Sequence, residues 1–300
     1  MTLSSSSPQA RGVPSGAQVR PVEVDAAGLR LSGLLALPPG PPRAVIVALH
    51  GAGMRAGYFH GAADPAASLL TLAASRGYAA LALDRPGYGL SAATVPDGLE
   101  LAEQASHVRQ ALTGYHGRDP IGAGFVIVGH SLGGKVALAV AAGWSGEAAL
   151  LGVDVSGISD RWAVDRELRG EVNGRRTRSL SWGPLRLYPP GTFQHALRLA
   201  APVPPREAAE IPEWPRRYPE VAREVRVPVR FTFAEHERWW RCDPATVEAM
   251  TAWLAAPVVR TEHLAGAGHN ISLGYAARDY HLGVLAFADE CLARSNSDTT

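Results

Sequence analysis

Cysteine, methionine and lysine are all scarce in this chain. Its 300 residues contain 2 cysteines, 3 methionines and a single lysine, Lys135, although lysine and arginine together number 29. Cys242 and Cys291 lie far apart in sequence, so we expect neither a disulfide framework nor a cysteine metal site. Arginine stands where lysine would be usual, which we interpret as compositional bias, and we assign Lys135 no chemistry.

Long apolar runs and nucleotide-binding motifs are also missing. No run approaches the length of a membrane span, and residues 1–16 lack the apolar core of a signal peptide. We therefore expect a flexible tail over 1–16, a cytoplasmic protein and no membrane partner. Neither a Walker-type phosphate loop nor a dinucleotide fingerprint follows a first strand, so we expect no cofactor, no metal and no nucleic-acid partner.

The chain has enough apolar sequence for one large core. Of its residues 46% are hydrophobic, and residues 17–300 are interpreted as one domain of the α/β class. Short apolar runs predict strands near 20–25, 29–37, 43–49, 78–83, 125–129, 149–155, 229–233 and 258–264. Amphipathic segments predict helices near 65–76, 99–113, 132–143, 244–254 and 272–292. Continuously apolar strands favour a parallel sheet that is covered on both faces.

The most informative stretch is residues 125–134, Phe-Val-Ile-Val-Gly-His-Ser-Leu-Gly-Gly. A short apolar strand delivers Ser131, framed as G-x-S-x-G, directly into a helix-forming segment. The glycines two residues before and two after the serine remove Cβ atoms that would collide in so sharp a turn. We predict that this turn is a nucleophile elbow with Ser131 as the nucleophile.

A serine hydroxyl needs a base, an acid that orients the base, and donors for the oxyanion. Of the ten histidines, His269 alone sits on a glycine-flanked turn after the last predicted strand, and it is our candidate base. His130 adjoins Ser131, but neighbours on a sharp turn diverge, so we expect its side chain to point elsewhere.

The candidate acid is Glu237. The run 227–233 predicts a strand, and Glu237 falls in the first turn after it, where a carboxylate would hold an imidazole in the required tautomer. Glu235, Asp243 and Asp154 remain as rivals for this role.

The oxyanion donors are predicted to come from two backbone positions. One is the N–H of Leu132, directly after the nucleophile. The other is the N–H of Ala52, with Gly53 as the near alternative, because a glycine-bracketed loop lets the backbone approach a ligand closely.

Together these segments resemble the α/β-hydrolase superfamily, which has the same chain order of serine, acid and histidine. The resemblance covers about Val22 to Ala293 and rests on the 50–53 loop, the serine elbow, Gly268–His269 and the segment 84–91, Asp-Arg-Pro-Gly-Tyr-Gly-Leu-Ser. It implies the α/β-hydrolase fold, with a mostly parallel eight-stranded sheet, helices on both faces and a lid between strands six and seven.

The resemblance also bears on two carboxylates. It implies that the 84–91 loop serves loop geometry, so we do not expect Asp84 to be catalytic. In the family, a glycine and an aspartate are commoner after the seventh strand, whereas this chain has Ala234 and Glu237 there. The candidate acid therefore departs from the commoner family pattern.

Residues 159–223 interrupt the alternation of strands and helices and are interpreted as the lid. They carry twelve arginines and eight acids, whereas the whole chain has a net charge of +1, so a basic lid could attract an anionic substrate. A solvated helical surface is the alternative. Trp182 from this segment and Trp239 and Trp240 after the acid are candidate substrate-binding residues, together with Gly53.

The sequence thus predicts a serine hydrolase that cleaves an ester, or a thioester, of a small or medium hydrophobic acyl compound. Serine at the elbow argues against relatives that place aspartate there. Acyltransferase, C–C hydrolase or lyase chemistry on the same residues is an alternative, as is a ligand receptor without catalysis. The oligomeric state is left open.

Overall fold

The computed structural model describes residues 17–61, 63–169 and 175–297, so the tail expected over 1–16 lies outside the described residues. The chain forms an eight-stranded sheet in the order β1-β2-β4-β3-β5-β6-β7-β8. Its strands are β1 (Val19–Ala26), β2 (Leu29–Ala36), β3 (Val45–Leu49), β4 (Ala79–Leu83), β5 (Phe125–His130), β6 (Leu150–Ser156), β7 (Val229–His236) and β8 (Val259–Gly268).

The sheet is mostly parallel, as the sequence predicts. From β4 to β8 every neighbouring pair is parallel, and only the β1–β2 and β2–β4 pairs are antiparallel. The central strands β3, β4, β5 and β6 are buried at every residue, which their continuously apolar sequences allow. β1 and β2 form a hairpin whose two-residue turn, Ala27–Gly28, has positive φ at both positions.

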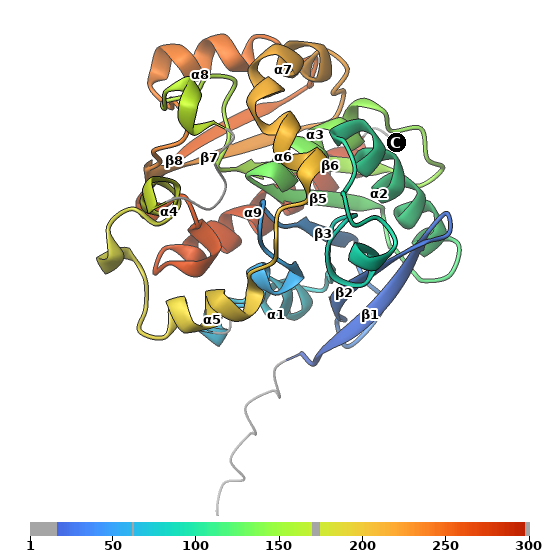
Figure 1. The fold of residues 1–300 in the computed structure, drawn as a ribbon. Helices are drawn as coiled ribbons and strands as arrows, with labels where there is room; N and C mark the ends of the chain where they lie inside the picture. The colour runs from blue at the N-terminus through green and yellow to red at the C-terminus, as the bar shows by residue number, and fades with distance from the viewer. Residues whose placement is uncertain (1–16, 62, 170–174, 298–300) are drawn as a thin grey trace, which may run out of the picture.

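Helices cover both faces of this sheet (Figure 1). One face packs against α2 (Leu101–His116), α3 (Leu132–Ala142), α7 (Trp214–Ala222) and α8 (Pro244–Thr251). The other packs against α1 (Leu69–Ser75) and α9 (Ala277–Ser297). Short 3₁₀ turns lie at 56–59, 65–67, 89–93, 166–168, 185–187, 211–213 and 271–273. In a sheet covered in this way, a ligand site is expected at the edge where the parallel strands have their carboxyl ends.

Three predicted elements were misplaced by four residues or more, and the ends of β7, α2 and α8 by three. The helix expected over 65–76 is split, because the Ser68 side chain accepts the Thr71 N–H and starts α1 anew after a 3₁₀ turn. β8 continues past residue 264 to Gly268, with an irregular register opposite β7. The closing helix begins at Ala277 rather than near 272, because the chain is extended at Gly274 after its own 3₁₀ turn.

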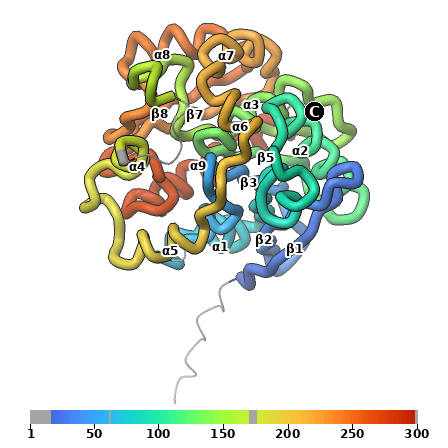
Figure 2. The backbone as a smooth tube through the Cα atoms, in the orientation of Figure 1, coloured from blue at the N-terminus to red at the C-terminus, as the bar shows by residue number. Residues whose placement is uncertain are grey.

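Residues 157–228, here called the insert, connect β6 to β7 and enclose the expected segment 159–223. They hold α4 (Arg175–Trp182), α5 (Thr192–Leu199), α6 (Pro205–Glu210) and α7. Figure 2 shows this part of the chain passing in front of β3 and β5 on its way from α5 to α7. Contacts tie it to the loops at the sheet edge, such as the hydrogen bond from the Ala201 N–H to the Gly53 carbonyl at 3.0 Å.

A buried ion pair joins β6 to β7. Arg230 lies beside Asp154 in register, and its Nη1 donates to Asp154 Oδ2 at 2.5 Å, with side chains 6% and 0% exposed. The Tyr280 hydroxyl donates to the other carboxylate oxygen at 3.2 Å. Arg230 also pairs with Glu262 on β8, whose side chain is 46% exposed. One arginine therefore links three neighbouring strands.

We expect Asp154→Ala to lower the free energy of unfolding by about 3–5 kcal/mol, because it leaves the buried Arg230 charge without its inner partner. Glu262→Ala removes the outer partner of the same arginine and should cost less than about 1 kcal/mol, because that carboxylate is half exposed. Urea denaturation of both variants measures the difference. Equal losses in the two variants would contradict this assignment.

Candidate active site

Ser131 occupies a strained turn between β5 and α3. Its φ of 52° and ψ of −117° lie where a residue with a side chain is rarely found. A Cβ built on Gly129 would lie 2.6 Å from the Gly134 Cα, and one on Gly133 would lie 2.5 Å from the His50 carbonyl oxygen. Only glycine therefore fits on either side of the serine, which gives the G-x-S-x-G spacing its steric reason.

The loop after β3 packs directly against this turn. A Cβ on Gly51 would lie 3.2 Å from the Ser131 Cβ, so the two backbones approach closely. Leu132 is the first residue of α3, where N–H groups have no partner within the helix. The Gly53 N–H already donates to the Tyr88 hydroxyl at 3.2 Å, which leaves Ala52 as the stronger candidate for the second oxyanion donor.

His269 and Glu237 form a close pair. His269 Nδ1 lies 2.7 Å from Glu237 Oε2, and the side chains are 7% and 3% exposed. The other carboxylate oxygen accepts the N–H groups of Arg238 at 3.0 Å and Trp239 at 2.9 Å. With Nδ1–H donating to the carboxylate, Nε2 is left as the proton acceptor, which is the tautomer that a general base needs.

Glu237 is held as a carboxylate. Burial alone would raise its pKa, but the charge and hydrogen bond of His269 and the two backbone N–H donors outweigh burial and lower the pKa below its usual value. A negative charge is therefore present beside the imidazole at neutral pH.

The rival acids are engaged elsewhere. Glu235 is exposed and accepts the Gly266 N–H, and Asp243 caps α8 through the N–H and hydroxyl of Thr246. Asp154 is committed to Arg230. Of the four carboxylates considered, Glu237 alone contacts His269 among the described residues.

The structure also places two residues set aside in the sequence. Asp84 accepts the Ser32 hydroxyl at 2.7 Å and the Ala56 N–H at 2.8 Å, contacts that fix loop geometry. The expectation that His130 points away from the site was wrong. Its ring lies 5.0 Å from the His269 ring, because stacking on Tyr58 and a contact of 3.1 Å between its Nδ1 and the Ser156 hydroxyl hold it there.

A cavity of about 500 Å³ opens at this point, and Ser131, His269, Leu132 and Ala52 all line it. Its walls also include the predicted binding residues, which are Gly53, Trp182, Trp239 and Trp240. Sequence reasoning did not single out the further lining side chains, which are Trp162, Phe193, Arg169 and Arg178 of the predicted lid and Lys135 of α3. For Lys135 a signal existed, because it is the one lysine of the chain and lies one helical turn after Ser131.

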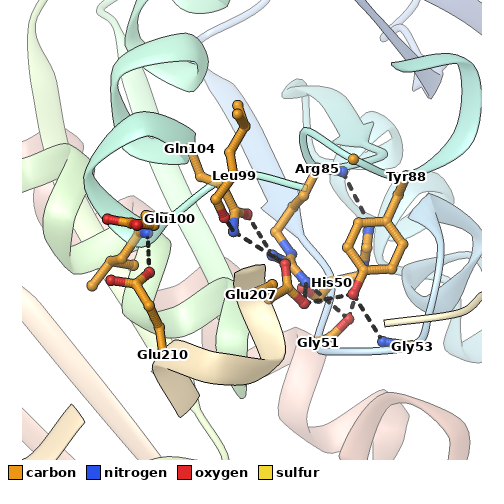
Figure 3. A network of polar contacts seen from close by, with 12 residues as sticks. His50, Gly51, Gly53, Arg85, Tyr88, Leu99, Glu100, Gln104, Glu207 and Glu210 are labelled. Carbon is orange, nitrogen blue, oxygen red and sulfur yellow. Dashed lines mark hydrogen bonds and ion pairs between the residues drawn. The ribbon is translucent and has the colours of Figure 1, made fainter. Parts of the chain in front are cut away.

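A buried polar network holds the insert against the loop that carries Ala52 (Figure 3). Glu207 on α6 pairs with Arg85 through two hydrogen bonds of 2.7 and 3.1 Å, and both side chains are fully buried. The Tyr88 hydroxyl donates to Glu207 at 2.5 Å and accepts the Gly53 N–H. Gln104 completes the set by donating to Glu207 and accepting from Arg85.

His50 belongs to the same network as a neutral imidazole. Its Nε2 accepts the Arg85 backbone N–H at 3.0 Å, so Nδ1 carries the proton and donates to the Gly51 carbonyl at 2.8 Å. Burial and the neighbouring Arg85 charge hold its pKa well below the usual value. The loop geometry thus depends on an uncharged His50.

Two features are absent from the described residues. No group of three or more His, Cys, Asp or Glu side chains among them could hold a metal ion. None of their helices is long and apolar enough to cross a bilayer.

We expect stability to fall as the pH drops below about 6.5. Burial lowers the pKa of His50, His130 and His281, the last to about 4, so below about 6.5 the unfolded chain binds protons that the folded chain does not. Each of these histidines then lowers the free energy of unfolding by up to about 1.4 kcal/mol per pH unit. Above about pH 6.5 this loss is absent, because the histidines are neutral in both states. Urea denaturation across this range measures the slope.

His281→Gln is the matched variant for this pH dependence. It removes one buried imidazole that lies outside the cavity lining, so the slope between about pH 6.5 and 4.5 should be shallower by one histidine. Identical slopes in the two proteins would show that His281 is not neutral in the folded state.

The sequence model of the Alpha/beta hydrolase family matches residues 46–280. A comparison with curated proteins finds no significant match. A thermostable carboxyl esterase from Bacillus coagulans aligns with 93% of this chain and 99% of its own, at a TM-score of 0.67 and 16% identity. An N-acyl homoserine lactonase, AidH, aligns with 91% of this chain and 98% of its own, at a TM-score of 0.64 and 16% identity.

A thermophilic esterase from Thermogutta terrifontis aligns with 91% of this chain and 99% of its own, at a TM-score of 0.60 and 16% identity. At such low identity these likenesses show a shared fold. The family match includes the elbow, His269 and Glu237 within its bounds. The chain therefore belongs to the α/β-hydrolase family, and the enzyme class that this membership indicates is that of a hydrolase.

Proposed function

We propose that the chain is a serine hydrolase that cleaves a carboxylic ester, or a thioester, of a small or medium hydrophobic acyl compound. The observation that carries the proposal is that His269, paired through Nδ1 with the buried Glu237, lines the same cavity as Ser131. The cavity is lined largely by aromatic and aliphatic side chains, which suits an apolar acyl group. Two of the proteins that share the fold are named esterases and a third is named an N-acyl homoserine lactonase, which supports hydrolysis of an ester bond.

In the first step the Ser131 hydroxyl attacks the substrate carbonyl while His269 Nε2 takes its proton. Glu237 accepts the Nδ1–H bond and stabilises the imidazolium that forms. The N–H groups of Leu132 and Ala52 bind the oxyanion of the tetrahedral intermediate. Collapse of the intermediate breaks the ester bond, and His269 returns the proton to the departing alcohol or thiol.

The second step releases the acyl group. Water attacks the acyl-serine carbonyl, His269 accepts a proton from the water, and the same two N–H groups bind the oxyanion. Ser131 then leaves with the proton from His269, and a carboxylic acid is the product. In this scheme the insert acts as a lid that bounds the acyl cavity.

We expect Ser131→Ala to lower kcat for an activated ester at least about a thousandfold, because the nucleophile is lost. The serine is partly buried and the substitution removes only its hydroxyl, so the melting temperature should stay close to that of the parent protein. Retained turnover in the folded variant would refute the proposal.

A ligand receptor on the same scaffold predicts another pattern. Such a protein would turn over no activated ester in its unmodified form but would show a ligand-dependent shift in melting temperature. An acyltransferase would make ester product only when a second alcohol is supplied. Product analysis with and without added alcohol therefore distinguishes the three possibilities.

We expect Glu237→Gln to lower kcat with little change in KM, because the amide is a poor partner for the imidazolium that exists in the transition state. Asp243→Asn and Asp154→Asn are the comparison variants, and both should lose less turnover. Steady-state kinetics on folded protein decide the matter. A larger loss in either comparison variant would move the role of acid to that residue.

A further inference from the structure

The Lys135 side chain lies among three tryptophan rings at the cavity wall. It lies on α3 one turn beyond Ser131, and it is 4% exposed. Its Nζ lies 5.1 to 5.5 Å from three indole ring centroids, those of Trp162, Trp214 and Trp240. Two of these rings come from the insert and one from the segment after β7, and together they are called the tryptophan cage below. Such rings attract a cation but accept no ordinary hydrogen bond.

The ammonium group of Lys135 has donors to spare. Among the residues that the structure describes, its hydrogen bond goes to the Ile211 carbonyl at a long 3.4 Å, although Nζ can donate three. The nearest carboxylates are engaged with other partners. Glu207 belongs to the buried network. Glu210 accepts the Leu101 N–H through Oε2 and pairs with Arg217 through Oε1 at 2.7 Å by charge alone, since Oε1 accepts no hydrogen bond from the described residues. Neither carboxylate accepts a hydrogen bond from Lys135 among those residues. A buried ammonium with unused donors favours an acceptor that arrives with the ligand.

The charged side chains that line the cavity are all basic, and Lys135 also borders a smaller pocket lined by Glu207 and Glu210. Lys135, Arg169 and Arg178 line it, and no Asp or Glu occurs among its described lining residues. Walls of low dielectric strengthen the attraction of such a cavity for anions. A doubly charged phosphate is more costly to desolvate within indole rings than a singly charged carboxylate.

We propose that Lys135 and its tryptophan cage form a carboxylate-binding subsite that selects substrates with a free carboxylate beyond an apolar spacer, such as half-esters of dicarboxylic acids. The inference rests on the proposed function, because it places the scissile ester at Ser131. The carboxylate accepts the free N–H groups of Lys135, and the spacer lies along the aromatic wall. Lys135 thereby acts as a specificity-determining residue of the cavity.

Protonation of Lys135 gives the subsite a pH signature. Burial lowers the pKa of Lys135 to about 7, against the opposing charges of Glu207 and Glu210 and with a smaller contribution from Arg85. The ammonium form is therefore present below about pH 7 and is lost above it in the unliganded protein. The preference for a charged over a neutral ester should decline as the pH rises through that value, whereas the neutral ester has no such dependence on Lys135.

Binding to the Ser131→Ala variant tests the subsite without turnover. Calorimetry at about pH 6 compares monomethyl adipate with dimethyl adipate, which has the same chain without the charge. We expect the half-ester to bind on the order of ten- to a hundredfold more tightly, the range typical of a hydrogen bond between charged groups. Lys135→Met in the same background should abolish this preference, and Lys135→Gln provides a second neutral variant if the methionine protein does not fold.

Arg216→Met is the matched control. It removes one positive charge from α7 in the insert, but its side chain is 88% exposed and does not line the cavity. We expect it to keep the preference for the half-ester. A preference that survives both neutral Lys135 variants, or equal binding of the two adipates to Ser131→Ala, would overturn the proposal. Tighter binding of a phosphonate analogue of equal length would also overturn it, because the subsite would then prefer an anion other than a carboxylate.

Turnover separates this inference from the proposed function. If the unmodified protein hydrolyses dimethyl adipate but binds both adipates equally in the Ser131→Ala background, the hydrolase stands and the subsite fails. If it hydrolyses neither ester but the Lys135-dependent preference is present, the subsite stands and the hydrolase assignment fails.

Discussion

The buried ion pair between Arg85 and Glu207 is the interaction on which the site depends. It joins Arg85, in the loop after β4, to Glu207 on α6, 122 positions later in the chain. Both side chains are buried from solvent. Removing two charges from water is costly, so such a pair is tolerated only where the remaining donors and acceptors are satisfied. The remaining donors of Arg85 are satisfied, because they bind the carbonyls of His50 and Gly51 and the side chain of Gln104.

This ion pair also reaches the loop after β3, which carries Ala52. The Tyr88 hydroxyl links Glu207 to the Gly53 N–H, so the position of α6 and the position of the loop beside Ala52 are coupled. The Ala201 N–H binds the Gly53 carbonyl from the same side. Both backbone polar groups of Gly53 are thus held by groups that depend on the insert. A backbone donor fixed in this way needs little reorganisation when an oxyanion forms.

The elements that sequence could predict are those determined by local interactions. The central strands β3, β4, β5 and β6 follow from apolar runs of five to seven residues, and the elbow follows from steric exclusion within a few residues of Ser131. Glu237 could be placed only against three rivals, because its contact with His269 spans 32 positions and no local pattern encodes it. The meaning of Lys135 was missed for the same reason. Its helix position is visible in the sequence, but its cage is assembled from three distant segments.

The arrangement of charge reconciles two demands on the cavity. The proposed reaction needs a carboxylate near the imidazole, yet a carboxylate facing the ligand would repel an anion. Glu237 meets both conditions because it lies behind His269, with one oxygen on Nδ1 and the other on two backbone N–H groups, and it does not line the cavity. Its negative charge interacts with the Nδ1–H of His269 and with the backbone N–H groups of Arg238 and Trp239. The wall that the ligand meets therefore stays cationic, while the negative charge acts only through the imidazole ring.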